Sequence, residues 1–270
     1  MIVLSNKFAP ATRLLWHSGV LGALDGIAKA GFSAAEVWAS HISESRVPPL
    51  LVKQRANELG LALSLHAPSY DLNPLSSNPE IRSLSRRLVL DSLEVAARLE
   101  AKIVVVHPGA LSSSTDDPEE YWGRLEEYAV QLDARAAHLG LTVAIEAMEK
   151  KRLQFVTSIS SLERLSRLLN SVSARQVGIC LDIAHAGTLG DPEEFLATVP
   201  RIVHLHLSDT SDEKTHALLG EGRLNLAAIV PKLLEKISKT TGLIVIEGRL
   251  ASDEARAIAV AASYLARFSS

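Results

Sequence analysis

Short apolar runs rich in β-branched residues recur at nearly even intervals along the chain, each followed by a turn and a helical pattern. This alternation is typical of a parallel sheet, because a crossover helix must return the chain to the same end. A spacing of about 25 to 40 residues provides one βα unit per strand. Eight units in 270 residues predict a single α/β domain, a (β/α)8 TIM barrel spanning residues 1–270. The expected strands are Ile2–Ser5, Ala35–Trp38, Leu61–His66, Ile103–His107, Thr142–Glu146, Val177–Asp182, Ile202–Leu207 and Leu243–Glu247.

Helix signals support this phasing. Asp117–Pro118 and Asp191–Pro192 each place an N-cap acceptor before a proline at the first helical position. Apolar residues three and four apart predict helices at Ile81–Glu100 and Leu226–Ser238. No linker rich in Pro, Gly or Ser interrupts the pattern. The competing fold, a doubly wound open sheet, would carry a glycine-rich fingerprint after the first strand, and none is present.

The composition limits the available chemistry. The single cysteine, Cys180, excludes a disulfide framework and a cysteine-based zinc site, so any metal must be held by His, Asp or Glu. A formal charge of −3, from 28 Lys+Arg and 31 Asp+Glu, gives no electrostatic signature for nucleic acid or anionic membranes. The sequence contains no signal-peptide pattern and no membrane-length apolar run. We therefore expect a cytoplasmic protein.

Acidic and imidazole side chains stand where strands end. In a (β/α)8 barrel, active sites form at the carboxyl end of the strands. Strand alternation predicts that these side chains point inward, as at Glu146, where Val143 and Ile145 face out and Ala144 faces in. Buried acids need compensation, which a divalent cation gives to several at once. The strand-end residues are His66, His107, Glu146, Asp182, His206 and Glu247, and two further imidazoles, His185 and His216, lie just past strand ends.

The mixture of nitrogen and oxygen ligands suits Zn, Mn, Fe or Co without selecting among them. Three other residues have inward parity. His204 lies one layer below His206 and is expected either to support the metal ligands from behind or to lie in the core. Cys180 lies below Asp182 and lacks a paired base, so a catalytic thiol is not favoured. Glu36 is expected either to contact substrate or to form an internal ion pair.

At these residues the sequence resembles the xylose-isomerase-like TIM-barrel superfamily, which includes sugar and sugar-phosphate isomerases and epimerases together with the endonuclease IV family of apurinic-site nucleases (AP endonuclease family 2). The resemblance covers most of the chain and supports the barrel over the open sheet. The matching segments are SLHAP (64–68), VHPG (106–109), AIE (144–146), LDIAH (181–185), HLSD (206–209), HALLGEG (216–222) and IE (246–247).

Similarity to the epimerase branch implies one metal held by Glu146, Asp182, His206 and Glu247. It also implies that Glu146 and Glu247, on opposite sides of the substrate, remove and return a proton on the carbon beside a carbonyl. Metal polarisation of that carbonyl would make the C–H acidic enough for carboxylates. His185 would then contact the substrate.

Similarity to the nuclease branch implies instead a dinuclear or trinuclear zinc phosphoester hydrolase. His66, His107 and Glu146 would hold one zinc, and Glu146 would bridge to a second. Asp182, His206 and Glu247 would hold that second zinc. His185 and His216 would hold a third with an Asp two residues before His216, but this position is Lys214. A cation there removes one ligand and repels a metal. The family's amino-terminal DNA-contacting segment also has no counterpart in residues 1–41.

We favour the isomerase or epimerase, with one to three metal ions, a small sugar or phosphorylated substrate, and Lys214 as a contact for phosphate. The extra imidazoles His66 and His107 favour the hydrolase, for which nucleic acid is an alternative but not a favoured substrate. A third reading is a metal-binding protein without catalysis, in which Glu146→Gln would affect no turnover. The sequence leaves the oligomeric state open.

Overall fold

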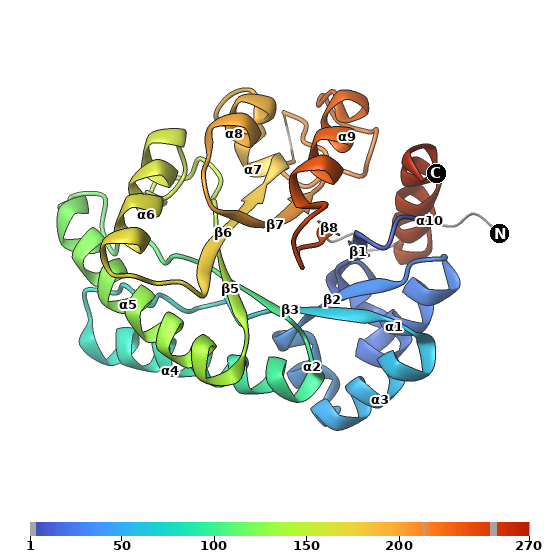
Figure 1. Ribbon diagram of the computed structural model, residues 1–270, viewed down its shortest axis with the longest axis horizontal. Helices are drawn as coiled ribbons and strands as arrows, with labels where there is room; N and C mark the ends of the chain where they lie inside the picture. The colour runs from blue at the N-terminus through green and yellow to red at the C-terminus, as the bar shows by residue number, and fades with distance from the viewer. Residues whose placement is uncertain (1–3, 213, 249–252, 270) are drawn as a thin grey trace.

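Eight parallel strands form a barrel surrounded by helices, which confirms the expected (β/α)8 TIM barrel (Figure 1). The computed structural model describes residues 4–212, 214–248 and 253–269. The strands follow the order β1-β8-β7-β6-β5-β4-β3-β2, and a parallel bridge between Ala11 and Glu36 links the two ends of the sheet. The strands are β1 (Phe8–Pro10), β2 (Ala34–Trp38), β3 (Ala62–His66), β4 (Ile103–Val106), β5 (Thr142–Glu146), β6 (Val177–Asp182), β7 (Ile202–Leu207) and β8 (Ile244–Ile246).

The helices lie outside the ring of strands (Figure 1). Those after β2 and β6 are split into two pieces. No helix of the described residues is long and apolar enough to cross a membrane. The helices are η1 (Thr12–Ser18), α1 (Gly19–Lys29), α2 (Ala39–Ser45), α3 (Pro49–Leu59), α4 (Pro79–Leu99), α5 (Pro118–Leu139), α6 (Ile159–Ser171), α7 (Ile183–Gly187), α8 (Pro192–Thr198), α9 (Leu226–Ile237), α10 (Glu254–Leu265) and η2 (Ala266–Phe268).

The expected helix starts are confirmed by hydrogen bonds. The Asp117 side chain accepts from the backbone N–H of Glu119 at the start of α5, and Asp191 accepts from Glu193 at the start of α8. Gly140 ends α5 with a φ of 67°, a left-handed conformation that glycine adopts at little cost. These ends fix where each helix stops and the next strand begins.

The first strand does not lie where the sequence pattern predicts. The expected strand Ile2–Ser5 is wrong where it can be compared, because Leu4 and Ser5 lie outside any strand and β1 begins at Phe8, after a turn. Ile2 and Val3 lie outside the described residues. Pro10 has no N–H and so weakened the strand signal. The β1–β8 pairing nevertheless continues past it, because the Ala11 N–H donates to the Ile246 carbonyl at 2.9 Å.

Alternation along the strands is confirmed. Val104, Val143 and Ile244 pack with the helices in the main apolar core, whereas Val105 and Ala144 fill the barrel interior. A second interior cluster contains Ala9, Ala11, Trp16, Ala34, Trp38, Leu243 and Val245. The outward-facing side chains pack against the helices, and the inward-facing positions at the strand ends are available for the functional site.

A register shift in β7 sets the direction of its two histidines. Ile179 pairs with Ile202 but Cys180 pairs with His204, so Val203 is an extra residue in β7. Gly178 leaves room for it, since a Cβ there would lie 2.6 Å from a Val203 methyl carbon. His204 and His206 consequently face inward beside Cys180 and Asp182.

Candidate metal and active site

The strand-end side chains meet at one mouth of the barrel. Four sets of three or four residues bring possible ligand atoms within 4.8 Å of one another. Most of these side chains are buried, although His107 and His216 are partly exposed. The sets are Glu146, Asp182, His206 and Glu247; His66, His107 and Glu146; Asp182, His185 and His216; and Glu36, His204 and His206.

His206 Nδ1 lies at the centre of the first set. Its distances are 2.9 Å to Glu247 Oε2, 3.3 Å to Glu146 Oε1 and 3.9 Å to Asp182 Oδ2. The four residues come from the ends of β5, β6, β7 and β8, or directly after them. One imidazole nitrogen and three carboxylates converging from four strands form a donor set suited to a divalent cation.

A second set shares Glu146. His66 Nε2 lies 3.4 Å and His107 Nε2 3.1 Å from Glu146 Oε2. His66 Nδ1 lies 2.8 Å from the carbonyl oxygen of Ala67, to which it can donate a proton, leaving a lone pair on Nε2 in the neutral ring. A lone pair that faces a carboxylate oxygen is repelled unless a proton or cation lies between them. Glu146 therefore belongs to two adjacent sets through its two oxygens.

His185 and His216 form the third set with Asp182. Their Nε2 atoms are 3.2 Å apart, while His185 Nδ1 contacts the Ala147 carbonyl and His216 Nδ1 contacts Ser208 Oγ at 2.8 Å each. The two imidazoles expected for a third metal thus do meet. Lys214, the cation in place of a carboxylate, lines the same pocket but is not a member of this set.

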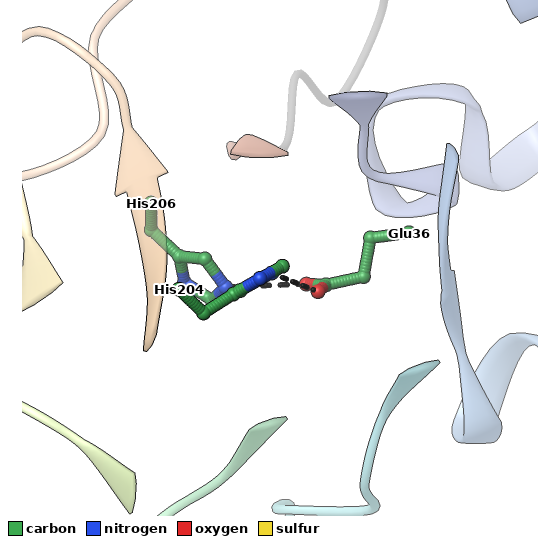
Figure 2. A group of neighbouring side chains, drawn as sticks. All are labelled: Glu36, His204 and His206. Atoms are coloured by element: carbon green, nitrogen blue, oxygen red, sulfur yellow. Dashed lines mark hydrogen bonds and ion pairs between the residues drawn. The ribbon is translucent and has the colours of Figure 1, made fainter. Parts of the chain in front are cut away.

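Glu36 lies beneath these groups and is fully buried. Its carboxylate extends from β2 toward the two imidazoles of β7 (Figure 2), with 3.0 Å from Oε2 to His204 Nε2 and 3.2 Å from Oε1 to His206 Nε2. Ser64 Oγ donates to Oε2 at 2.9 Å. The Leu243 N–H donates to His204 Nδ1 at 3.2 Å, so the neutral His204 ring carries its proton on Nε2 and donates it to Glu36. The Glu36 carboxylate thus lies directly beneath His206, although Glu36 Oε1 and His206 Nε2 are not aligned as a hydrogen bond.

Burial and mutual charge act in opposite directions on these groups. Burial alone would raise the pKa of Glu146, but His206 and the contacts from His107 and His66 hold that pKa well below its usual range. Burial also opposes ionisation of Glu247, whose pKa is nevertheless lowered, chiefly by His206. Burial would lower the pKa of His206, but the neighbouring Cys180, Glu36, Glu146 and Glu247 raise that pKa well above its ordinary value. Glu146 and Glu247 are therefore held in the ionised form by the imidazoles that surround them.

The donor set passes a test for fit to a divalent metal. Among the described residues, several buried ligand atoms have no hydrogen-bond partner although they lie close to one another: Glu146 Oε2, Asp182 Oδ2, His206 Nδ1, Glu247 Oε2 and His66 Nε2. Unpaired buried polar atoms are costly. A cation in the first set would satisfy Asp182 Oδ2, His206 Nδ1 and Glu247 Oε2, and one in the second set would satisfy Glu146 Oε2 and His66 Nε2. The residues present thus fit the metal that the sequence predicts.

A pocket of about 420 Å³ opens above the site. Its lining includes Glu146, His185, His216, Glu247 and Lys214. Three larger hollows lie elsewhere: two of about 910 Å³, one between α4 and α5 and one bordered by α2 and α4, and one of about 630 Å³ beside α10. None of the three is lined by a strand-end ligand. Chemistry rather than size makes the smaller pocket the candidate functional pocket.

Part of this pocket is formed by residues that the sequence pattern does not single out. Arg13, Tyr70, Glu149 and Lys151 line it, and none was expected there. Arg13 lies just past β1, so placing the first strand at residues 2–5 hid its position.

Cys180 is fully buried inside the barrel, and burial raises the pKa of its thiol, which agrees with a core role.

Comparisons with known proteins identify the family. Residues 24–267 match the xylose isomerase-like TIM barrel family, and the chain belongs to it. An uncharacterised protein of Methanocaldococcus jannaschii is 27% identical over 97% of this chain and 90% of its own length. A probable endonuclease 4 of Mycobacterium leprae is 26% identical over 63% of this chain and 68% of its own length.

A solved structure shares the complete fold. The crystal structure of a D-tagatose 3-epimerase-like protein superposes with a TM-score of 0.81, at 25% identity, over 96% of this chain and 97% of its own. Both branches named by the sequence resemblance are therefore represented among the related proteins. The epimerase-like structure matches along 96% of this chain, whereas the probable endonuclease 4 matches along 63%.

Proposed function

We propose that this protein is a divalent-metal-dependent isomerase or epimerase acting on a sugar or sugar phosphate. One observation carries the proposal: Glu146 and Glu247 approach the same nitrogen of His206 at 3.3 and 2.9 Å, and both line the pocket. Two carboxylates at one substrate-sized cavity provide a base and an acid for proton transfer. The similarity to a D-tagatose 3-epimerase-like structure supports a sugar as the substrate.

Glu146, Asp182, His206 and Glu247 would hold the metal, with Zn, Mn, Fe and Co all compatible with their nitrogen and oxygen donors. When bound, the metal would polarise the substrate carbonyl and acidify the adjacent C–H. One glutamate would remove the proton from that carbon, and the other would return a proton to the opposite face. The carbon then changes configuration while atoms and charge balance.

Other pocket residues would hold the substrate. We propose that His185, which is buried beside Glu146, contacts a substrate oxygen. Lys214 makes no ion pair with a described residue and lines the pocket, so we propose that it binds a phosphate group. Of the two roles expected for Glu36, we propose that of internal ion-pair partner, because the side chain is fully buried below the pocket and contacts His204 and His206.

Exchange of solvent deuterium into substrate carbon tests the proposal. D-Tagatose and other ketoses, with and without a phosphate group, are incubated in D2O with Mn²⁺-loaded protein. Glu146→Gln and Glu247→Gln should each abolish exchange, because an amide cannot take up the proton. Glu127→Gln, which alters a carboxylate on the outer helix α5, should exchange at the wild-type rate. Exchange that survives both site changes would exclude the two glutamates as the acid and base.

A dinuclear phosphoester hydrolase is the second candidate, favoured by one observation. His66 and His107 meet at Glu146 Oε2, which gives more ligands than a single metal needs. Similarity to a probable endonuclease 4 points in the same direction. The test is hydrolysis of bis(p-nitrophenyl) phosphate and of DNA with an apurinic site. Hydrolysis without deuterium exchange would replace the isomerase proposal with this one.

A further inference from the structure

Arg13 joins the site from the segment that follows β1, a strand that contributes no candidate ligand. It lies in η1, three residues past the end of β1, while Glu247 follows β8, the parallel neighbour of β1. Pro10 pairs with Ile246, and this register places both side chains at the same barrel mouth. Arg13 Nη1 consequently lies 3.1 Å from Glu247 Oε1.

Aromatic rings fix the direction of the Arg13 side chain. Its guanidinium carbon lies 4.5 Å from the ring centre of Trp38 and 5.8 Å from that of Tyr70. Trp38 itself stacks on His66, with 4.0 Å between ring centres and 13° between planes. A planar cation stacked on a buried ring loses little additional freedom when it binds a carboxylate. Arg13 is therefore a preorganised partner for Glu247.

This contact gives the two oxygens of Glu247 different surroundings. Oε2 faces His206 Nδ1 at 2.9 Å, within the candidate metal set, and Oε1 faces Arg13 in the pocket wall. Glu146 differs, because all of its ion-pair contacts among the described residues are with imidazoles. In the part of the chain that the structure describes, Arg13 is the one Lys or Arg paired with a buried carboxylate of the site (Glu36, Glu146, Asp182 or Glu247).

We propose that Arg13 is a positioning residue that restricts Glu247 to one oxygen toward the metal and keeps the other oriented toward the substrate. The proposal rests on the proposed function, in which Glu247 transfers a proton. Loss of Arg13 would free the carboxylate to turn both oxygens inward and would remove a positive charge that competes with a cation. The metal should then bind more tightly while proton transfer becomes slower.

The test compares Arg13→Met and Arg13→Lys with a matched control. Arg164 also pairs with a glutamate, Glu119, and lies 4.4 Å from the ring centre of Trp122, but outside the barrel. Arg164→Met removes the same kinds of contact far from the pocket. Each protein is stripped of metal with EDTA and titrated with Mn²⁺ by calorimetry. We then measure deuterium exchange into the ketose that the wild-type protein turns over.

Arg13→Met should bind Mn²⁺ at least about threefold more tightly, because a nearby cation has been removed. Its kcat for exchange should fall at least about tenfold with KM changed by less than about threefold, as expected when positioning of a reacting group is lost. Arg13→Lys keeps the charge but loses the planar group that stacks on Trp38. Its Mn²⁺ affinity and its kcat should lie between those of wild type and Arg13→Met. Arg164→Met should match wild type in both measurements.

Unchanged or weaker Mn²⁺ binding by Arg13→Met would overturn the proposal and leave Arg13 a structural role. An unchanged kcat for exchange by Arg13→Met would also overturn the proposal. If wild type exchanges no ketose, the proposed function fails by itself, and the Mn²⁺ titration still decides whether Arg13 restrains Glu247.

Discussion

His206 of β7 and Glu36 of β2 meet across the barrel interior, with 3.2 Å between Nε2 and Oε1 (Figure 2). The carboxylate lies beside one ring nitrogen without hydrogen-bond alignment, and the other nitrogen, Nδ1, is directed at Glu247, Glu146 and Asp182. Metal-binding histidines are commonly oriented in this way by a carboxylate on the other nitrogen. The relationship links a fully buried residue, which does not line the pocket, to the affinity of the site above it.

Glu36→Gln should weaken metal binding by about 10- to 100-fold, the usual cost of losing such a supporting partner. The amide retains one acceptor but presents its NH2 group to His204 or Ser64, which are themselves donors. Mn²⁺ titration of the EDTA-treated protein measures the change. Ser64→Ala, which removes one hydrogen bond from Glu36 and leaves His206 in contact, is the control and should stay close to wild type. Equal affinities in wild type and Glu36→Gln would refute a supporting role for Glu36.

Purified protein prepared without chelator should contain at least one tightly bound divalent metal per chain. Removing the metal should lower stability, because a ligand that binds only the folded chain adds about 4 kcal/mol at a thousandfold excess over Kd. For a chain of this length, the loss corresponds to on the order of 10 °C in Tm. Elemental analysis and thermal melts before and after EDTA check both points. Metal content no higher than the buffer blank would end the metal hypothesis.

The double change His66→Ala and His107→Ala separates the two candidate functions. If the protein is an isomerase with one principal metal, that metal remains on Glu146, Asp182, His206 and Glu247, and deuterium exchange continues. If it is a hydrolase, one metal and the hydrolytic activity are lost together. Metal stoichiometry and both activities are measured on the same preparation. Retention of two metals by the double variant would count against a site at His66 and His107.

Tyr128→Phe tests the packing outside the site. Tyr128 on α5 is fully buried, and among the described residues its hydroxyl has no hydrogen-bond partner. Burial also raises the pKa of the hydroxyl, which keeps it protonated. Removing an unpaired buried hydroxyl should leave the free energy of unfolding unchanged or raise it by about 1 kcal/mol. Chemical denaturation gives the value, and a loss above about 1 kcal/mol would reveal a partner for the hydroxyl.

Much of the fold follows from local sequence patterns. The strands at Thr142–Glu146, Val177–Asp182 and Ile202–Leu207 have the predicted bounds, because apolar β-branched runs between helix signals are local features. The first strand failed for an equally local reason: Ile2–Ser5 has a stronger apolar pattern than Phe8–Pro10, which contains a proline. Only the pairing of Phe8 with Ile244 in the closed barrel identifies the actual strand.

The sequence by itself determined which residue types stand at the strand ends, because strand alternation and the polarity of a (β/α)8 barrel send such side chains to one mouth. Tertiary structure decided which atoms face each other. Glu36 contacts two histidines 168 and 170 residues away, and Arg13 contacts Glu247 234 residues away. These contacts depend on barrel closure, on the extra residue Val203 in β7 and on side-chain rotation. None of these has a local sequence signal, because each arises only when distant strands pack side by side.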